Sequence, residues 1–198
     1  MHADHVLDLV TLRYVYPWRA LPKERRLRVI MPPGSADQLL DLARGVGNAR
    51  HFEDCYRLSE HDGSTPLAFD GGLSLTPVPM QHYVPCWGFR AEADGVRLAY
   101  TADTAPCPAL DDLADSADLL LSEATLRSLD EDAVPPEPRG HLLPAEAGTV
   151  ARASGAKRLL LTHLPTNGNG DWARVQATEA YGADVEVAEP AQTYEVGG

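Results

Sequence analysis

The sequence has few cysteines, few basic residues and no long hydrophobic run. Its three cysteines, Cys55, Cys86 and Cys107, are odd in number and form no Cys-x-x-Cys pair. This pattern argues against a disulfide framework and predicts reduced thiols in the cytoplasm. Cys86 could be a ligand or a reactive thiol, and a packing role is favoured over both. No signal peptide is visible, and no apolar stretch approaches the roughly 20 residues that span a bilayer. We therefore expect no membrane partner.

The shortage of basic residues bears on possible partners. The chain has 17 Lys and Arg residues against 29 Asp and Glu residues, a net charge of −12. Binding a polyanion depends on Lys and Arg displacing its counterions, so a broad electrostatic surface for nucleic acid is disfavoured. A chain of 198 residues with 44% hydrophobic and 23% charged residues is typical of a globular protein with its own core. We predict one domain over residues 1–198.

Two histidines and an aspartate stand within the first five residues, which read Met-His-Ala-Asp-His. Imidazole and carboxylate groups are ligands that zinc and similar divalent ions prefer. A short turn leading into a helix near His5 would aim His2, Asp4 and His5 at one point. The alternative is a solvated chain start that holds two histidines by chance.

Three further residues of the same kind follow runs that are typical of strands. His82 comes after the alternating residues 73–78, Asp103 ends Leu-Ala-Tyr-Thr-Ala-Asp, and His163 follows Arg-Leu-Leu-Leu-Thr. Sheet-based folds often place their chemistry just beyond the ends of strands, because rigid strands aim loop residues into a common crevice. The sequence therefore predicts that these side chains converge.

The remaining pattern alternates helices and strands. Helices are expected over residues 5–16, 35–44, 110–117, 144–154 and 171–181. Strands are expected over residues 27–31, 88–93, 96–101, 119–122, 158–162, 185–187 and 193–196. Ser35 and Asp171 are expected to cap their helices. This mixture predicts the α/β (α+β) class, with sheets covered by helices as in an αββα sandwich.

The order of these motifs resembles the metallo-β-lactamase superfamily, and within it the ribonuclease Z-like phosphodiesterase branch. The family motif is His-x-His-x-Asp-His, and its first histidine would stand immediately before Met1. The family also has a β-rich segment before this motif, so the resemblance implies an αββα sandwich whose N-terminal strands are missing here. We expect the recorded start to be an internal Met codon of a longer protein; the alternative is a short, impaired form.

The resemblance also implies a metal centre with two divalent ions, zinc or manganese. The site of the first ion lacks the family's first histidine here, so this ion is expected to bind less tightly. The first ion would be held by His2, His82 and Asp103. The second would be held by Asp4, His5, His163 and Asp103, with Asp103 bridging the two ions and Asp4 counted among the catalytic residues. Two such ions can clamp a phosphodiester and lower the pKa of a shared water.

His141 and Glu123 are further catalytic candidates. His141 lies in a loop that enters a helix, and an imidazole can protonate the oxygen of a leaving group. Glu123 follows a strand and resembles an acidic residue of the family that could orient this histidine; the alternative is that His141 packs at the helix entrance and Glu123 is solvated. His51 and His61 lie in polar stretches, and we predict that both are at the surface.

The function predicted from these features is a metal-dependent hydrolase, a phosphodiesterase that acts on a small phosphodiester or a cyclic nucleotide. One alternative is a ribonuclease Z-type RNA endonuclease. The net charge disfavours it. Transfer-RNA-processing ribonucleases of this family often carry a long protruding arm, whereas only a short hairpin lies between His82 and Asp103 here. A second alternative is a catalytically impaired metal-binding or interaction module that forms a homodimer through an exposed sheet edge.

Overall fold

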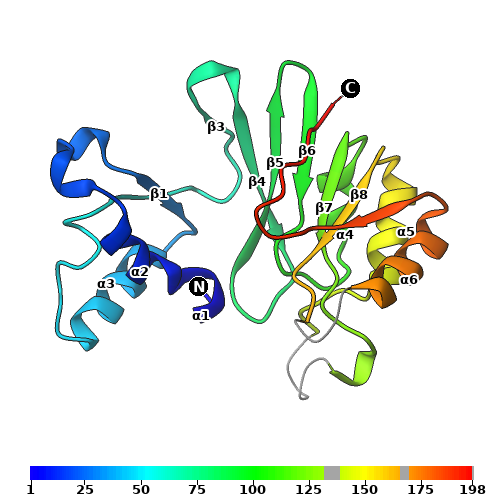
Figure 1. Cartoon of the computed structure of the whole chain (residues 1–198), viewed down its shortest axis with the longest axis horizontal. Helices are drawn as coiled ribbons and strands as arrows, with labels where there is room; N and C mark the ends of the chain where they lie inside the picture. Colours follow the sequence, from blue (N-terminus) through cyan, green and yellow to red (C-terminus); the bar gives the residue numbers. More distant parts are fainter. Residues whose placement is uncertain (132–138, 166–169, 198) are drawn as a thin grey trace. The chain divides into compact units, whose positions relative to one another are not determined.

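The computed structural model describes residues 1–131, 139–165 and 170–197. It divides into two compact units, Met1–Gly63 and Ser64–Gly198 (Figure 1). Among the residues described, no helix combines the length and the apolar character that are needed to cross a membrane. Each unit has a hydrophobic cluster of its own. The single domain predicted for the whole chain stays a prediction.

The unit Met1–Gly63 combines helices with a two-stranded parallel sheet. Its elements are α1 (Ala3–Val6), α2 (Asp8–Val15), the 3-10 turns η1 (Trp18–Ala20) and η2 (Lys23–Arg25), β1 (Arg28–Met31), α3 (Ser35–Gly45) and β2 (Arg57–Glu60). Helix α3 buries Leu39 and Ala43, which lie four residues apart and so on one face. They belong to the same cluster as Phe52 and Tyr56, which forms the core of this unit.

Two histidines predicted to be at the surface are buried in this unit. His51 and His61 are each 4% exposed. His51 Nε2 lies 3.2 Å from the carbonyl oxygen of Val10, and the backbone N–H of Gly63 donates to His61 Nδ1 over 3.0 Å. Burial lowers the pKa of His61. The prediction is wrong because polar neighbours in sequence do not reveal the backbone partners that folding brings to a ring.

The ends of several helices also differ from the prediction. The helix expected over residues 5–16 is interrupted at Leu7, which separates α1 from α2. Helix α3 begins at Ser35, but its capping residue is Gly34, whose φ of 76° is the left-handed conformation that suits glycine. The helix that begins at Asp171 follows a glycine in the same conformation. A left-handed glycine, rather than a side-chain oxygen, therefore precedes both helices.

The unit Ser64–Gly198 is built on a seven-stranded sheet. Its strands lie in sequence order: β3 (Leu67–Ala68), β4 (Ser74–Met80), β5 (Cys86–Ala93), β6 (Val96–Tyr100), β7 (Leu119–Glu123), β8 (Leu159–Thr162) and β9 (Val185–Val187). Neighbours are antiparallel from β3 to β6 and parallel from β6 to β9. Residues 193–196, which lie in the described part of the chain, pair with no strand, so the strand predicted there is wrong. The Arg158 side chain, not a neighbouring strand, donates to the Glu195 carbonyl oxygen over 2.7 Å.

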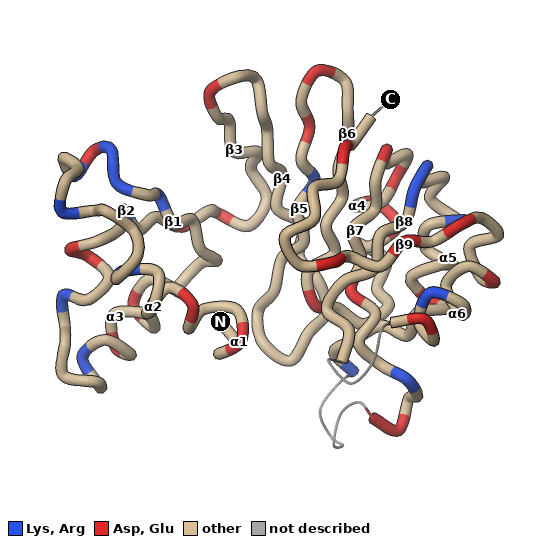
Figure 2. Tube along the Cα trace, in the orientation of Figure 1, with Lys and Arg blue, Asp and Glu red and all other residues tan. Residues whose placement is uncertain are grey.

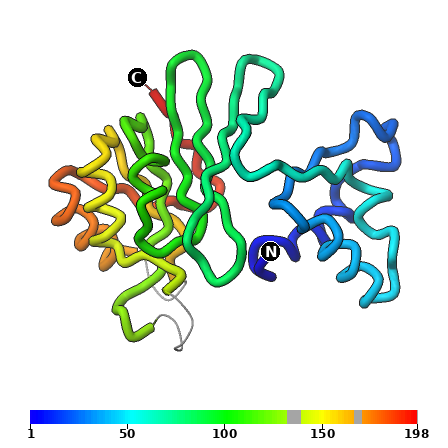
Figure 3. The backbone as a smooth tube through the Cα atoms, turned by 180° about the vertical axis from the view of Figure 1, so that it is seen from behind, coloured from blue at the N-terminus to red at the C-terminus, as the bar shows by residue number. Residues whose placement is uncertain are grey.

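Three helices pack against one face of this sheet: α4 (Pro108–Ala114), α5 (Pro144–Ser154) and α6 (Asp171–Tyr181) (Figures 1 and 3). Two short 3-10 turns, η3 (Asp70–Gly72) and η4 (Leu129–Glu131), lie in its connections. Helices α5 and α6 approach closely at Gly148. A Cβ there would collide with the carbonyl oxygen of Ala177. Strand residues Leu120 and Leu161 are fully buried in the same core.

Gly88 in β5 packs against the backbone where β6 ends. A Cβ at this position would stand 2.7 Å from the carbonyl oxygen of Tyr100 and 3.0 Å from that of Thr101, and neither atom can rotate away. We expect Gly88→Ala to lower the free energy of unfolding by about 1–3 kcal/mol, measured by urea denaturation. Gly45→Ala is the control, because a Cβ there meets no atom within 4 Å. Equal unfolding midpoints for the two variants would contradict this packing.

The strand directions bring four predicted site residues to one edge of the sheet. Strand β4 is antiparallel to β5 and β5 to β6, so β4 and β6 run in the same direction as β7 and β8. The carboxyl ends of these four strands therefore share an edge. His82, Asp103 and His163 follow β4, β6 and β8, and Glu123 is the last residue of β7.

Candidate metal centre

The backbone turns sharply at two of the predicted ligands. Ala102, directly before Asp103, has a φ of 50°, and His163 itself has a φ of 54°. Residues other than glycine adopt this left-handed conformation rarely, at a cost of about 1–3 kcal/mol, and such residues cluster at functional sites. The structure therefore holds a strained backbone at the positions where the ligands leave β6 and β8.

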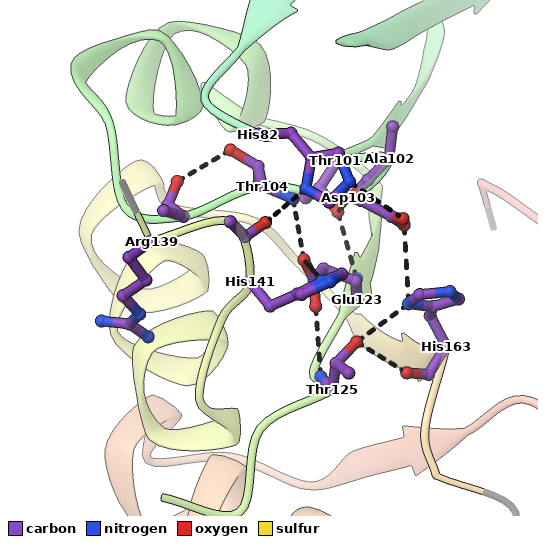
Figure 4. A network of polar contacts seen from close by, with 12 residues as sticks. His82, Thr101, Ala102, Asp103, Thr104, Glu123, Thr125, Arg139, His141 and His163 are labelled. Atoms are coloured by element: carbon purple, nitrogen blue, oxygen red, sulfur yellow. Dashed lines mark hydrogen bonds and ion pairs between the residues drawn. The ribbon is translucent and has the colours of Figure 1, made fainter. Parts of the chain in front are cut away.

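Asp103 lies between two imidazole rings (Figure 4). Its carboxylate is 3% exposed, with Oδ2 at 3.8 Å from His82 Nε2 and Oδ1 at 3.5 Å from His163 Nδ1. A carboxylate buried this deeply is costly unless positive charge or hydrogen-bond donors compensate it. The three side chains therefore form a compact set of nitrogen and oxygen donors.

Hydrogen bonds orient both rings. His82 Nδ1 lies 2.8 Å from the carbonyl oxygen of Gly140, which can only accept, so Nδ1 donates this hydrogen bond and Nε2 faces Asp103. The Thr125 hydroxyl donates to the carbonyl oxygen of His163 over 2.9 Å and lies 2.8 Å from His163 Nδ1. Such contacts fix the tautomer and the orientation of metal-binding histidines in proteins.

His141 is held by Glu123 beside this cluster. Its Nδ1 lies 3.0 Å from Glu123 Oε1, and its ring centroid lies 4.9 Å from that of His82 and 5.7 Å from that of His163. Glu123 is 1% exposed and accepts hydrogen bonds from the backbone N–H groups of Thr104 and Thr125, at 2.7 and 3.1 Å. The contact predicted between Glu123 and His141 is present, and Glu123 is buried rather than solvated.

The surroundings of the site raise the pKa of two neighbouring groups. Burial, together with the negative charge of Asp103, raises the pKa of Tyr100 to about 12. Burial, followed by the charge of Asp103, also raises the pKa of the Cys86 thiol. A neutral thiol is a poor metal ligand, and Cys86 packs against the hydrophobic core. This agrees with the packing role expected for it.

The residues present suit a divalent cation. Asp103, His141 and His163 each offer a ligand atom, and these atoms lie within 4.8 Å of one another. Two imidazoles with a carboxylate are donors that zinc binds well, and manganese accepts the same types. His82 Nε2 faces the same carboxylate and enlarges the donor set.

The N-terminal ligands predicted from the sequence belong to the other unit. Asp4 and His5 lie on α1, with His5 Nε2 at 3.5 Å from Asp4 Oδ2, and His2 directly precedes this helix. Both Asp4 and His5 are exposed within the chain. Their part in a metal site, with that of His2, stays a prediction.

The residues that orient the site were missed from the sequence. Thr101, Thr104, Thr125 and Gly140 all support predicted site residues through hydrogen bonds. Three of them stand one or two residues from a predicted site residue, and Gly140 directly precedes His141. A position next to a predicted site residue in the sequence was therefore a usable signal for these residues. It does not tell which backbone group contacts which ring.

Comparisons with known proteins agree with this geometry. A family model described as a beta-lactamase superfamily domain matches residues 1–164. A ribonuclease Z of Myxococcus xanthus is 44% identical over 153 residues, which are 75% of this chain and 45% of that protein. The chain spans between 45% and 59% of the length of the first curated relatives that it matches.

Solved structures show the same architecture. The metallo-beta-lactamase fold protein YhfI from Bacillus subtilis matches with a TM-score of 0.77 at 25% identity, covering 96% of this chain and 71% of that one. Zn(2+)-bound PqqB from Methylobacterium extorquens matches in fold with a TM-score of 0.67 at 20% identity, covering 98% and 70%. This chain belongs to the metallo-β-lactamase superfamily, in its ribonuclease Z-like branch. The predicted fold class is confirmed, and members of this superfamily are metal-dependent hydrolases.

Proposed function

We propose that this protein is a metal-dependent phosphodiesterase that acts on a small phosphodiester or a cyclic nucleotide. The observation that carries the proposal is the convergence of His82, Asp103, His141 and His163 at one edge of the sheet, with Glu123 behind His141. Three histidines and two buried carboxylates gathered in this way have little value for stability, because buried charges are costly. They are suited to binding a cation and moving a proton.

The side chains are assigned two roles, metal binding and proton transfer. His82, Asp103 and His163 would hold the metal, whose positive charge, when bound, stabilises phosphoryl oxygens and lowers the pKa of water. His141 donates a proton to the leaving oxygen, and Glu123 keeps its ring in place through the 3.0 Å contact. Glu123 is itself fixed by the N–H groups of Thr104 and Thr125. A second ion, and the ligand roles of His2, Asp4 and His5, belong to this proposal through the family resemblance alone.

A ribonuclease Z-type activity on RNA is the second candidate. It is favoured by the 44% identity to a protein of that name. Against it, Lys and Arg residues are outnumbered by acidic residues over the unit that holds His82 and Asp103 (Figure 2). Non-specific affinity for a polyanion depends on such cations, so the smaller substrate is the better match to this surface.

The proposal is tested with bis-p-nitrophenyl phosphate. Purified protein with added zinc or manganese is expected to release p-nitrophenolate, and His163→Ala is expected to release it no faster than the metal alone. Parallel assays with a cyclic nucleotide and with a transfer-RNA precursor separate the two candidate substrates. Metal binding without hydrolysis of any of these would contradict the proposal and favour a non-catalytic metal-binding module.

A further inference from the structure

A cavity of about 490 Å³ opens beside His141 in the unit Ser64–Gly198. Tyr83, Thr125, Arg127, Glu131 and His141 are among the residues that line it. Its volume lies within the range of about 300–1,000 Å³ that is usual for small-molecule sites. A substrate that reaches the metal centre through this cavity would therefore place a part other than the scissile group against Tyr83 and Arg127.

Arg127 gives this cavity a positioned cation. Its guanidinium lies 4.9 Å from the centroid of the Trp172 ring on α6, a cation–π contact that restricts its rotamers. Its backbone N–H donates to Glu131 Oε2 over 2.7 Å, which also fixes the local chain. A planar guanidinium held in this way can bind phosphate through two parallel hydrogen bonds.

Tyr83 gives the cavity an aromatic wall. The ring packs so closely on Gly140 that a Cβ there would stand 2.6 Å from two of its atoms. It also meets the rings of His82 and His141, with centroids 4.8 and 5.7 Å away. An aromatic ring fixed on several sides is a surface on which a nucleobase can stack, whichever base it is.

We propose that this cavity binds a nucleotide that carries a second phosphate in addition to the scissile phosphodiester. The nucleoside lies against Tyr83, and the second phosphate pairs with Arg127. This inference rests on the proposed phosphodiesterase function and narrows its substrate class, since a simple cyclic nucleotide has no second phosphate for Arg127.

Glu131 provides an opposing charge in the same cavity. Its carboxylate accepts from the backbone of Arg127, and a glutamine at this position can accept the same hydrogen bond. Glu131→Gln therefore removes a negative charge beside the proposed phosphate position without removing that contact. It is expected to strengthen binding of the second phosphate several-fold, because like charges close together repel.

The experiment measures binding rather than turnover. Isothermal titration of the full chain compares thymidine 3′-phosphate with thymidine 3′,5′-bisphosphate, two ligands without a phosphodiester to cleave. We expect the bisphosphate to bind about ten-fold more tightly or better, since a hydrogen bond to a charged group is worth at least that factor. Arg127→Gln should abolish the preference. Arg152→Gln removes the same charge and should retain the preference, because Arg152 is exposed in the last turn of α5.

The outcomes separate the two proposals. Equal affinities for the two ligands, no binding of either, or a preference that survives in Arg127→Gln would overturn the inference, whatever the hydrolysis assay shows. A preference lost in Arg127→Gln, in a protein that hydrolyses no phosphodiester, would support the nucleotide site while removing the proposed function.

Discussion

Asp103→Asn is expected to abolish metal-dependent hydrolysis while leaving the protein folded. Asp103 is the carboxylate that faces both His82 and His163, at 3.8 and 3.5 Å. An amide of the same shape lacks the charge that binds a cation and offers only one oxygen. Zinc content measured by mass spectrometry of the dialysed protein should fall, and release of p-nitrophenolate should drop to the level of zinc without protein.

The stability of the metal-free protein gives an independent test of this role. Because Asp103 is 3% exposed, its charge is costly to bury, and a neutral amide removes that cost. The midpoint temperature of thermal unfolding of metal-free Asp103→Asn should therefore equal or exceed that of the native protein. Such an effect is typical of residues that serve function at the expense of stability. Asp184→Asn, an exposed position before β9, is the matched control and should change neither zinc content nor hydrolysis. A large loss of stability in Asp103→Asn would assign Asp103 a structural role.

His141→Ala is expected to lower the rate in a way that depends on the leaving group. An alkoxide leaves poorly unless it is protonated, so the loss on 3′,5′-cyclic AMP should be about 10²–10⁴-fold, the usual contribution of a general acid. p-Nitrophenolate spreads its negative charge over the ring and departs without a proton. The loss of kcat on bis-p-nitrophenyl phosphate should therefore be much smaller.

Two further measurements distinguish this role from metal binding. Glu123→Gln should lower the rate on the alkyl substrate about 10–100-fold with the same leaving-group dependence, because the part that Glu123 plays in catalysis is to position His141. The zinc content of both variants should stay native. A loss of zinc from His141→Ala, with equal rate losses on both substrates, would instead make His141 a ligand with Asp103 and His163, since their donor atoms lie within 4.8 Å of one another.

Much of the candidate site could be anticipated from the sequence, because its residues stand at the ends of strands that the sequence pattern predicts. His82, Asp103 and His163 each follow a run of strand-forming residues, and parallel strands bring their carboxyl ends to one edge. The pairing of Glu123 with His141 was also expected from the resemblance, and the two groups lie 3.0 Å apart. The chemical roles of all five residues remain predictions for the experiments above.

Other features were beyond the reach of sequence reasoning because they depend on partners far away along the chain. The carbonyl oxygen of Gly140 orients His82 across 58 positions, and no local pattern indicates that these two groups pair. His51 is buried through a contact with Val10, 41 positions away. Arg127 acquires its place in a cavity from Trp172 on another element.

The amino-acid sequence by itself determined most of the order of helices and strands, the superfamily and the residue types at the strand ends. These follow from the period of apolar residues and from short motifs, which are local properties of a chain. Only the tertiary structure decided which polar groups are buried, which nitrogen of His82 faces Asp103, and that Tyr83 and Arg127 line one cavity. Those outcomes depend on packing between distant segments, where a few ångströms determine whether two groups meet.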